Sequence, residues 1–231
     1  LELIGRSAFS ECEALQEIRL PDGLEEIGSD AFSGCRSLRQ ITVPVGVKCI
    51  ETAVFRSCRA LQEVHLPEGL EQIGMFAFEA CDTLTRIVLP ASLKQLCRGA
   101  FENCTSLLEA QLPDGLEELQ DGAFEYCRSL QKVTIPAQVR QIEQAAFYYC
   151  QSLQEVQLPE ELNEIGEDAF AHCWALKRIV IPAGVEKVGE HAFWECYSLQ
   201  NIAVLSDDTE IAEDAFGDCP GTVKRGTGSL F

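Results

Sequence analysis

Phenylalanine recurs every 23 residues along the chain, and no other sequence feature constrains the fold as strongly. The ten positions follow one another without insertion or deletion: Phe9, Phe32, Phe55, Phe78, Phe101, Phe124, Phe147, Phe170, Phe193 and Phe216. Cysteine follows all of them by three residues, leucine follows nine of them by six, and proline follows eight of them by twelve. A fixed period of about 20 to 50 residues is typical of solenoids and other repeat arrays. We therefore expect a single array of about ten units.

One unit can be followed from Leu15 to Cys35. Ile18 and Leu20 alternate with polar neighbours, which predicts a short strand at residues 17–20 with one buried face. Pro21 ends this strand, because proline cannot donate a hydrogen bond to a neighbouring strand and is excluded from central strands.

The second half of the unit is predicted to be a short extended piece followed by a turn. Leu24 and Ile27 bracket the extended piece. Residues 30–35 are too few for an independent helix, so we interpret them as one helical turn. Phe32 and Cys35, three residues apart on that turn, would face the same side.

Stacking of equivalent units explains how so short a repeat can bury its apolar residues. Equivalent strands then run in the same direction and form a parallel sheet. The sequence predicts an α/β repeat fold, a solenoid with the sheet on one side and short helical turns and short second strands on the other. We place the solenoid at residues 1–219 and a C-terminal tail or linker at residues 220–231, where the pattern degrades.

The repeat also resembles a known family. The string L-x-x-I-x-L-P-x-x-L-x-x-I-G-x-x-A-F-x-x-C is similar to the BspA-like (Treponema-type) leucine-rich repeats of 23 residues, and the resemblance extends from Leu1 to about Cys219. It implies a leucine-rich-repeat solenoid whose role is binding, since some members of the family are adhesins of bacterial surfaces. The family carries no catalytic residues that could be transferred to this chain.

The charge balance limits the partners. The formal net charge is -19, whereas a nucleic-acid binder needs Lys and Arg to displace counterions from phosphates. No run approaches the roughly 18 consecutive apolar residues of a membrane helix. We therefore expect another protein as the partner, with no nucleic acid and no direct membrane insertion. A contact through the uncapped N-terminal end, where Leu1, Leu3 and Ile4 already belong to a repeat, is a further hypothesis.

The cysteine column raises the question of metal or disulfide chemistry. Metal sites need ligands that converge from different directions, whereas a column presents all its thiols in the same way. Stacked cysteines also direct their Cβ atoms in parallel, which does not suit a disulfide. We interpret the column as small buried core residues. Cys49 and Cys97 lie outside the column and are expected to be unpaired.

The sequence offers little for catalysis. His65, His172 and His191 occupy three different repeat positions, and none has a nucleophile beside it in a recognisable motif. Glycine patterns for phosphates or dinucleotides and paired histidines for zinc are absent. We expect no enzyme activity, no metal site and no cofactor.

Two surfaces have polar residues that could recognise a partner, but each has a simpler explanation. The outward residues of the strands alternate in charge and include no large aromatic residue, so we interpret this face as solvated and unspecialised. A small basic group could bind an acidic partner or could pair with nearby glutamates; it consists of Arg36, Arg39, Arg56 and Arg59.

The aromatic residues outside the phenylalanine column are the strongest indication of a binding site. All the tyrosines and tryptophans lie between residues 126 and 197, one, two or four residues after the repeated phenylalanine. Stacking gathers them along the turns of repeats six to nine, while early repeats have Ser, Glu or Gly at the same positions. An exposed aromatic surface of this kind is typical of an interaction site. The candidate partner-binding residues are Tyr126, Tyr148, Tyr149, His172, Trp174, Trp194 and Tyr197.

Alternatives remain open for these rings and for the whole chain. The rings could instead pack laterally against neighbouring turns or against another domain. The family resemblance favours a recognition or adhesion module of a surface or secreted protein. The many thiols and the lack of a visible signal segment favour an intracellular scaffold or a subunit of a larger assembly, and a structural spacer is a third possibility.

Overall fold

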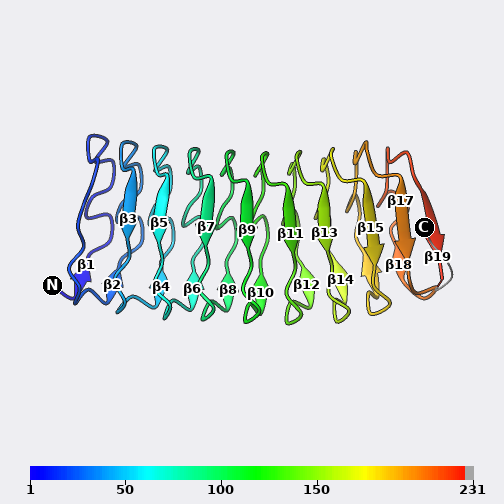
Figure 1. The fold of residues 1–231 in the computed structure, drawn as a ribbon, viewed down its shortest axis with the longest axis horizontal. Helices are drawn as coiled ribbons and strands as arrows, with labels where there is room; N and C mark the ends of the chain where they lie inside the picture. Colours follow the sequence, from blue (N-terminus) through cyan, green and yellow to red (C-terminus); the bar gives the residue numbers. More distant parts are fainter. Residues whose placement is uncertain (227–231) are drawn as a thin grey trace.

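The computed structural model describes residues 1–226. Each 23-residue repeat forms one coil, and successive coils stack side by side from left to right in Figure 1, from β1 in the first coil to β19 at the far end of the array. Successive coils pair residue by residue, so that Ile41 lies beside Val64 and Ile73 beside Leu96. The register is therefore the repeat length itself, because each paired residue is 23 positions further along the chain.

Parallel strands form two rows along the array. The first row, called the strand face here, consists of β3 (Gln40–Thr42), β5 (Glu63–His65), β7 (Arg86–Val88), β9 (Glu109–Gln111), β11 (Lys132–Thr134), β13 (Glu155–Gln157), β15 (Arg178–Ile181), β17 (Asn201–Val204) and β19 (Thr222–Arg225). Its strands group into three parallel sheets in the orders β3-β5, β7-β9-β11-β13 and β15-β17-β19. Their central residue points inward, as the alternation of apolar and polar residues predicts.

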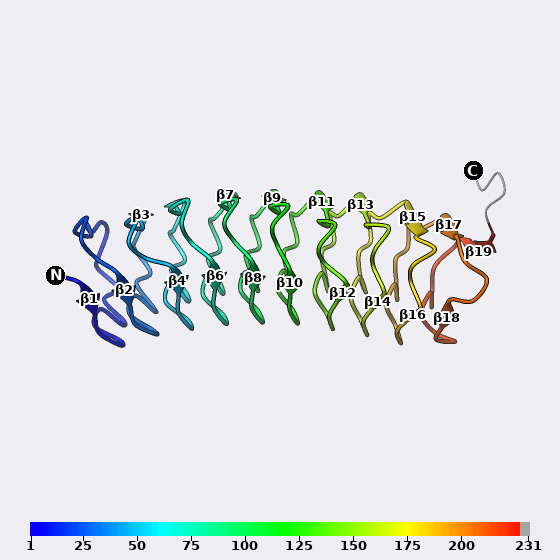
Figure 2. The same ribbon diagram turned by 90° about the horizontal axis from the view of Figure 1, so that it is seen from below.

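The second row lies on the other side of the coils (Figure 2). It consists of β1 (Leu3–Ile4), β2 (Glu26–Ile27), β4 (Cys49–Ile50), β6 (Gln72–Ile73), β8 (Gln95–Leu96), β10 (Glu118–Leu119), β12 (Gln141–Ile142), β14 (Glu164–Ile165), β16 (Lys187–Val188) and β18 (Glu210–Ile211). The predicted solenoid with parallel sheets and short second strands is confirmed by these two rows.

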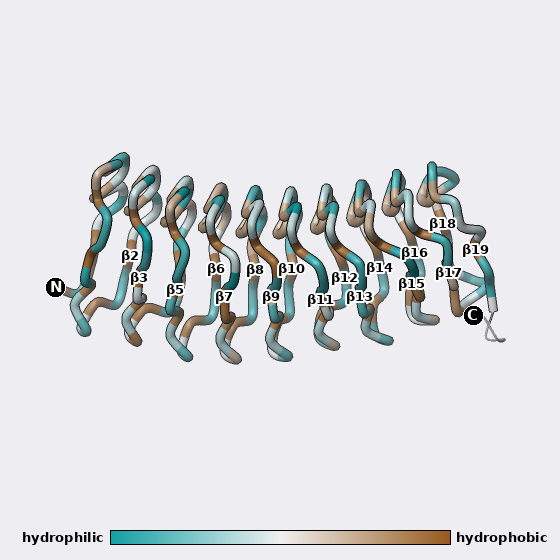
Figure 3. Tube along the Cα trace, turned by 45° about the horizontal axis from the view of Figure 1, so that its top comes forward, coloured by the Kyte–Doolittle hydropathy of each residue, from teal (hydrophilic) through white to brown (hydrophobic). Residues whose placement is uncertain are grey.

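A continuous phenylalanine column fills the core between the rows. Neighbouring rings are stacked, with centroids 5.1 Å apart between Phe9 and Phe32 and 5.2 Å apart between Phe170 and Phe193. From Phe32 to Phe193 the rings of the column are fully buried. Hydropathy recurs at the same place in every coil, which follows from the repeat (Figure 3). Burying one such aromatic ring stabilises the fold by about 1.5–3 kcal/mol relative to exposure.

The predicted helical turns are wrong: residues 1–226 contain no helix. Asp30 and Gly34 have positive φ angles of 58° and 74°, and this left-handed pair recurs around the repeated phenylalanine. The N–H groups of Asp30, Phe32 and Gly34 donate to carbonyls of the next coil, while those between them donate three residues back. A helix would use all these N–H groups within the segment. In the turn, alternate N–H groups donate to carbonyls of the next coil, and these hydrogen bonds between coils take the place of a helix.

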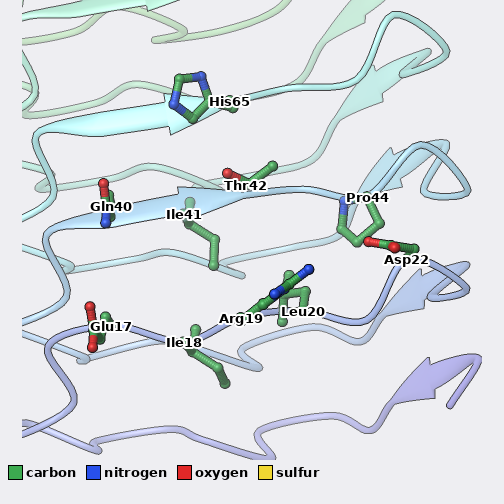
Figure 4. A pocket seen from close by; sticks show the side chains of 10 residues that line it. All are labelled: Glu17, Ile18, Arg19, Leu20, Asp22, Gln40, Ile41, Thr42, Pro44 and His65. Atoms are coloured by element: carbon green, nitrogen blue, oxygen red, sulfur yellow. The ribbon is translucent and has the colours of Figure 1, made fainter.

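The two ends of the array depart from the predicted strand pattern. Residues 17–20 lie beside β3 but form no strand, although Ile18 points to the same side as Ile41 (Figure 4). At the other end, β19 lies within residues 220–226 and pairs in parallel with β17. The rest of the predicted tail, residues 227–231, lies outside the described residues.

The interpretation of the cysteine column as buried core residues is confirmed from Cys35 to Cys196, and all twelve cysteines of the chain are free. Each column thiol from Cys35 to Cys196 also donates to a backbone carbonyl of the coil before, as Cys58 Sγ does to the oxygen of Phe32, at 3.2 Å. That oxygen also accepts a hydrogen bond from the N–H of Cys35. Burial raises the pKa of Cys35 to about 11. Burial raises the pKa of every column thiol from Cys35 to Cys196, so these protonated thiols link adjacent coils.

Residues 1–226 include no candidate for a membrane-spanning helix.

Candidate functional site

Six of the seven candidate residues form one unbroken series of ring contacts along the turns. Tyr126 contacts Tyr148 and Tyr149, with centroids 5.6 and 5.3 Å apart. Tyr149 lies 4.2 Å from the His172 ring and 5.9 Å from Trp174, which in turn lies 6.4 Å from Tyr197. We call this series the aromatic edge; it consists of Tyr126, Tyr148, Tyr149, His172, Trp174 and Tyr197.

The aromatic edge is open to solvent at its C-terminal end. Trp174 is 37% exposed and Tyr197 is 53% exposed, although both are large rings. Tyr126, Tyr148, Tyr149 and His172 are half-buried. The rings therefore pack on one another without being covered by the rest of the chain. This arrangement leaves an aromatic surface that crosses four coils.

The backbone does not favour rings at three of these positions. Tyr126, Tyr149 and His172 have φ angles of 58°, 59° and 60°. This left-handed region suits glycine or asparagine and is uncommon for bulky residues. Equivalent positions in other coils have Gly34 and Asn103, in the same conformation. The fold would accept those smaller residues, so it does not by itself account for the aromatic rings.

Trp194, the seventh candidate, lies apart from the aromatic edge. Its ring contacts His191 edge-on, with centroids 4.7 Å apart. It also covers Gly217 of the next coil so closely that a Cβ atom there would lie 2.4 Å from the indole. This close contact indicates that Trp194 closes the turn of its own repeat against the next one.

A carboxylate that the sequence analysis did not select connects several of these rings. Glu195 Oε2 lies 3.0 Å from His172 Nδ1. This buried nitrogen has no partner with hydrogen-bond geometry, so the contact is one of charge and proximity. A hydrogen bond from Tyr197 and the charge of His172 hold the pKa of Glu195 below its ordinary value. The same hydrogen bond raises the pKa of Tyr197 to about 12. An anionic group is thus fixed between the half-buried and the exposed rings.

An acidic hollow adjoins the other end of the aromatic edge. It has a volume of about 400 Å³, and the Tyr126 and Tyr148 rings form part of its wall. Four carboxylates and one guanidinium line it: Glu102, Asp121, Glu125, Asp168 and Arg98. We call this the acidic hollow. Sequence reasoning missed it, although Glu79, Glu102 and Glu125 recur at 23-residue spacing and so had to lie in one column.

Burial and mutual repulsion change the titration of the acidic hollow. Burial, and then the charge of Glu102, raise the pKa of Glu125 to about 7, with Arg98 opposing the shift. Burial first and Glu79 second raise the pKa of Glu102. Burial also raises the pKa of Asp168. The negative charge here is therefore only partly compensated within the chain.

The strand face, in contrast, pairs its own charges. Arg86 lies 3.8 Å from Glu109, and Lys132 lies 3.6 Å from Glu155, each pair joining adjacent strands. A hollow of about 670 Å³ near the N-terminal end of the strand face is lined mainly by polar side chains, such as Gln40 of β3 (Figure 4). These exposed pairs contribute little to stability, about 0–1 kcal/mol each. Because these ion pairs compensate the charges of the strand face, the face offers little net charge to attract a charged partner.

The basic group is also largely paired within the chain. Arg56 forms a short ion pair with Glu79, at 2.8 Å, and Arg59 lies 3.7 Å from Asp82. Arg36 lies 3.5 Å from Glu13. Pairing with nearby acidic residues, one of the two interpretations from the sequence, therefore accounts for three of the four arginines; Arg39 has no ion pair in the described chain.

The three histidines contact three different acidic residues. His65 lies exposed on β5, 2.9 Å from Glu63 of the same strand. His191 lies 2.9 Å from Asp214. Across residues 1–226, no group of three or more His, Cys, Asp or Glu side chains is arranged to hold a metal ion.

Comparison with known proteins identifies the repeat. The model of the BspA-type leucine-rich repeat region matches residues 1–108 and 98–223, which together span nearly the whole chain. The chain belongs to the BspA-type leucine-rich repeat family. The resemblance noted from the sequence is thereby confirmed.

Solved structures of similar repeat proteins agree with this assignment. A leucine-rich repeat protein from Bacteroides ovatus is 32% identical, with a TM-score of 0.90 over 97% of this chain and 59% of its own. A leucine-rich repeat protein from T. pallidum is 30% identical, with a TM-score of 0.66 over 75% of this chain and 82% of its own. This BspA-type chain thus spans little more than half the length of the B. ovatus protein.

A third similar structure is that of a protein described as a cell surface protein. It is a leucine-rich cell surface protein from Faecalibacterium prausnitzii, 27% identical, with a TM-score of 0.57 over all of this chain and 71% of its own. No curated protein matches this BspA-type chain. The comparisons therefore establish the repeat family.

Proposed function

We propose that this chain is a non-catalytic recognition module that binds another protein through the aromatic edge. The observation that carries the proposal is the unbroken ring series from Tyr126 to Tyr197, exposed at one end and placed where the fold needs no aromatic residue. Aromatic residues are enriched at protein interfaces, and clustered aromatic anchors supply most of the binding free energy there.

The strand face is the competing surface, and its chemistry is less suited to a partner. Its charges pair between adjacent strands, as with Arg86 and Glu109. Its exposed valines, Val88, Val180 and Val223, are small and lie on strands that are not adjacent. The aromatic edge has larger rings that contact one another.

We further propose that the module belongs to a surface or secreted protein. The support is the family and the description of the F. prausnitzii relative as a cell surface protein. Recognition of a partner at a cell surface needs no catalytic group, so a repeat solenoid with an exposed aromatic edge is sufficient for such a role. An intracellular scaffold would use the same aromatic edge.

Affinity capture from a native extract of the source organism tests the proposal. The wild-type chain is compared with a variant in which Trp174 and Tyr197, the exposed rings of the aromatic edge, are replaced by serine. The matched control replaces Val88 and Val180 of the strand face by serine. The proposal expects a protein that is retained by the wild type and the control but lost by the aromatic variant. A protein lost only by the strand-face control would overturn it.

A further inference from the structure

The acidic hollow and the aromatic edge are continuous, because Tyr126 and Tyr148 belong to both. The hollow is about 400 Å³ in volume, enough to receive one long side chain. From Tyr126 to Tyr197 the surface crosses three coil steps of about 5 Å each, the spacing of paired strands. An extended peptide of about five residues, rising about 3.3 Å per residue, would cover it.

The chemistry along this surface is anionic and aromatic. At one end, Glu102, Glu125, Asp121 and Asp168 surround a space that contains the single cation Arg98. At the other end, Glu195 lies between His172 and Tyr197. Rings beside a cation attract it through their electron-rich faces, and carboxylates pair with it directly.

Building on the proposed function, we propose that the partner presents a basic segment to this surface, with a lysine or arginine side chain in the acidic hollow and apolar residues along the aromatic edge. Charge complementarity favours a cationic occupant, because a further carboxylate would add to the charge of four carboxylates that Arg98 compensates only in part. An acidic or uncharged segment has no equivalent match there.

A metal ion is the other cation that carboxylates could bind, but the donors do not suit one. In the described part of the chain, no cluster of three or more acidic, cysteine or histidine side chains has the geometry for a metal. Nucleic acid is disfavoured by the net charge of -19. A protein cation has the required charge and also has neighbouring residues for the rings.

The titration of Glu125 supports the same occupant. Its pKa of about 7 reflects burial, then repulsion by Glu102, with attraction to Arg98 and repulsion by Asp168 as smaller effects; Asp121, Tyr126 and Tyr148 also line the space. A guanidinium or ammonium group placed in the hollow would favour the ionised carboxylate. Binding should therefore release protons near neutral pH and tighten as the pH rises from about 6 to 8.

A phage library of random seven-residue peptides, selected on the full chain, tests the inference. The decisive variant is Glu125→Gln with Asp168→Asn, which removes charge and keeps shape; asparagine also suits the left-handed backbone of Asp168 (φ 55°). The charge-matched control is Glu117→Gln with Glu186→Gln, two exposed residues outside the surface. Thermal melts of both variants establish that they are folded.

The inference expects selected peptides rich in Lys or Arg, whose affinity falls at least tenfold on the decisive variant and less than twofold on the control. Equal losses on both variants would indicate attraction by overall charge and would overturn it. Peptides that depend on Trp174 and Tyr197 but not on Glu125 and Asp168 would also overturn it, while leaving the proposed function intact. Peptides that depend on neither set would overturn both.

Discussion

The Sγ atom of Cys104 lies 3.1 Å from the carbonyl oxygen of Phe78, which also accepts a hydrogen bond from the N–H of Cys81. One thiol thus bridges two coils at a carbonyl that has room for two donors. The same contact recurs along the array, for example between Cys127 and Phe101 at 3.2 Å. The cysteine column therefore contributes directional bonds as well as apolar packing.

Replacing Cys104 with alanine should lower the free energy of unfolding by about 1–2 kcal/mol, because it removes a buried sulfur and a hydrogen bond. Chemical denaturation of the variant measures this. The exposed Cys12 at the N-terminal end has no such contact, so Cys12→Ala is the control and should change the midpoint little. A Cys104 variant as stable as the wild type would show that the thiol contact is incidental.

Replacing Glu125 with glutamine should stabilise the chain at pH 8 and leave it unchanged at pH 4. The folded pKa of about 7 lies above the ordinary value of 4.5, so the fold favours the neutral carboxyl. That preference is complete below about pH 4.5 and is lost as the pH rises through 7. With a discount for its half exposure, the gain at pH 8 is about 1 kcal/mol, or about 2–4 °C in melting temperature.

Thermal melts at the two pH values measure the difference. Glu117→Gln, which changes the same charge on an exposed residue, is the control. A melting temperature that rises equally at both pH values would contradict the account of Glu125.

Tyr197 should titrate abnormally, and Glu195 should be the cause. Its folded pKa of about 12 lies above the unfolded value of about 10. The contribution of this hydrogen bond to stability is therefore complete below pH 10 and lost as the pH rises toward 12. In Glu195→Gln the pKa of Tyr197 should fall toward 10, because the carboxylate charge is gone. Tyrosine-selective NMR titration measures it; an unchanged pKa would exclude Glu195 as the cause.

The exposed rings should matter far less for stability than the buried column. Trp174→Ser and Tyr197→Ser together should cost less than Phe147→Ala alone, which removes a fully buried ring and should cost about 3–5 kcal/mol. Urea unfolding of the two variants gives the comparison. A larger loss in the double variant would mean that the aromatic edge is structural.

The sequence pattern predicted the stacked coils and their sheets but not the backbone conformation of the turns. The phenylalanine column and the apolar alternation of residues such as Ile41 were sufficient to predict parallel sheets and a stacked core. The turn was mispredicted because its hydrogen bonds cross between coils, and Phe32 donates to the carbonyl of Val54 rather than within its own turn. A period of 23 residues does not show whether the N–H groups of the turn donate within the turn or to the next coil.

The candidate site was predicted only in part, for a related reason. Stacking brought Tyr126, Tyr149, His172 and Trp174 together, as their common repeat positions indicated. Trp194 belongs to an adjacent position, but its ring turns toward Gly217. The spacing of Glu102 and Glu125 placed them in one column, but the spacing does not show that their carboxylates line a hollow together with Asp121 and Asp168.

Site-specific photo-cross-linking tests the central claim most directly. A photoreactive phenylalanine analogue is placed at position 197, on the aromatic edge, or at position 88, on the strand face, and each chain is irradiated in a native extract. The account predicts a cross-linked partner protein from position 197 and none from position 88. The same partner captured from position 88 alone would contradict it.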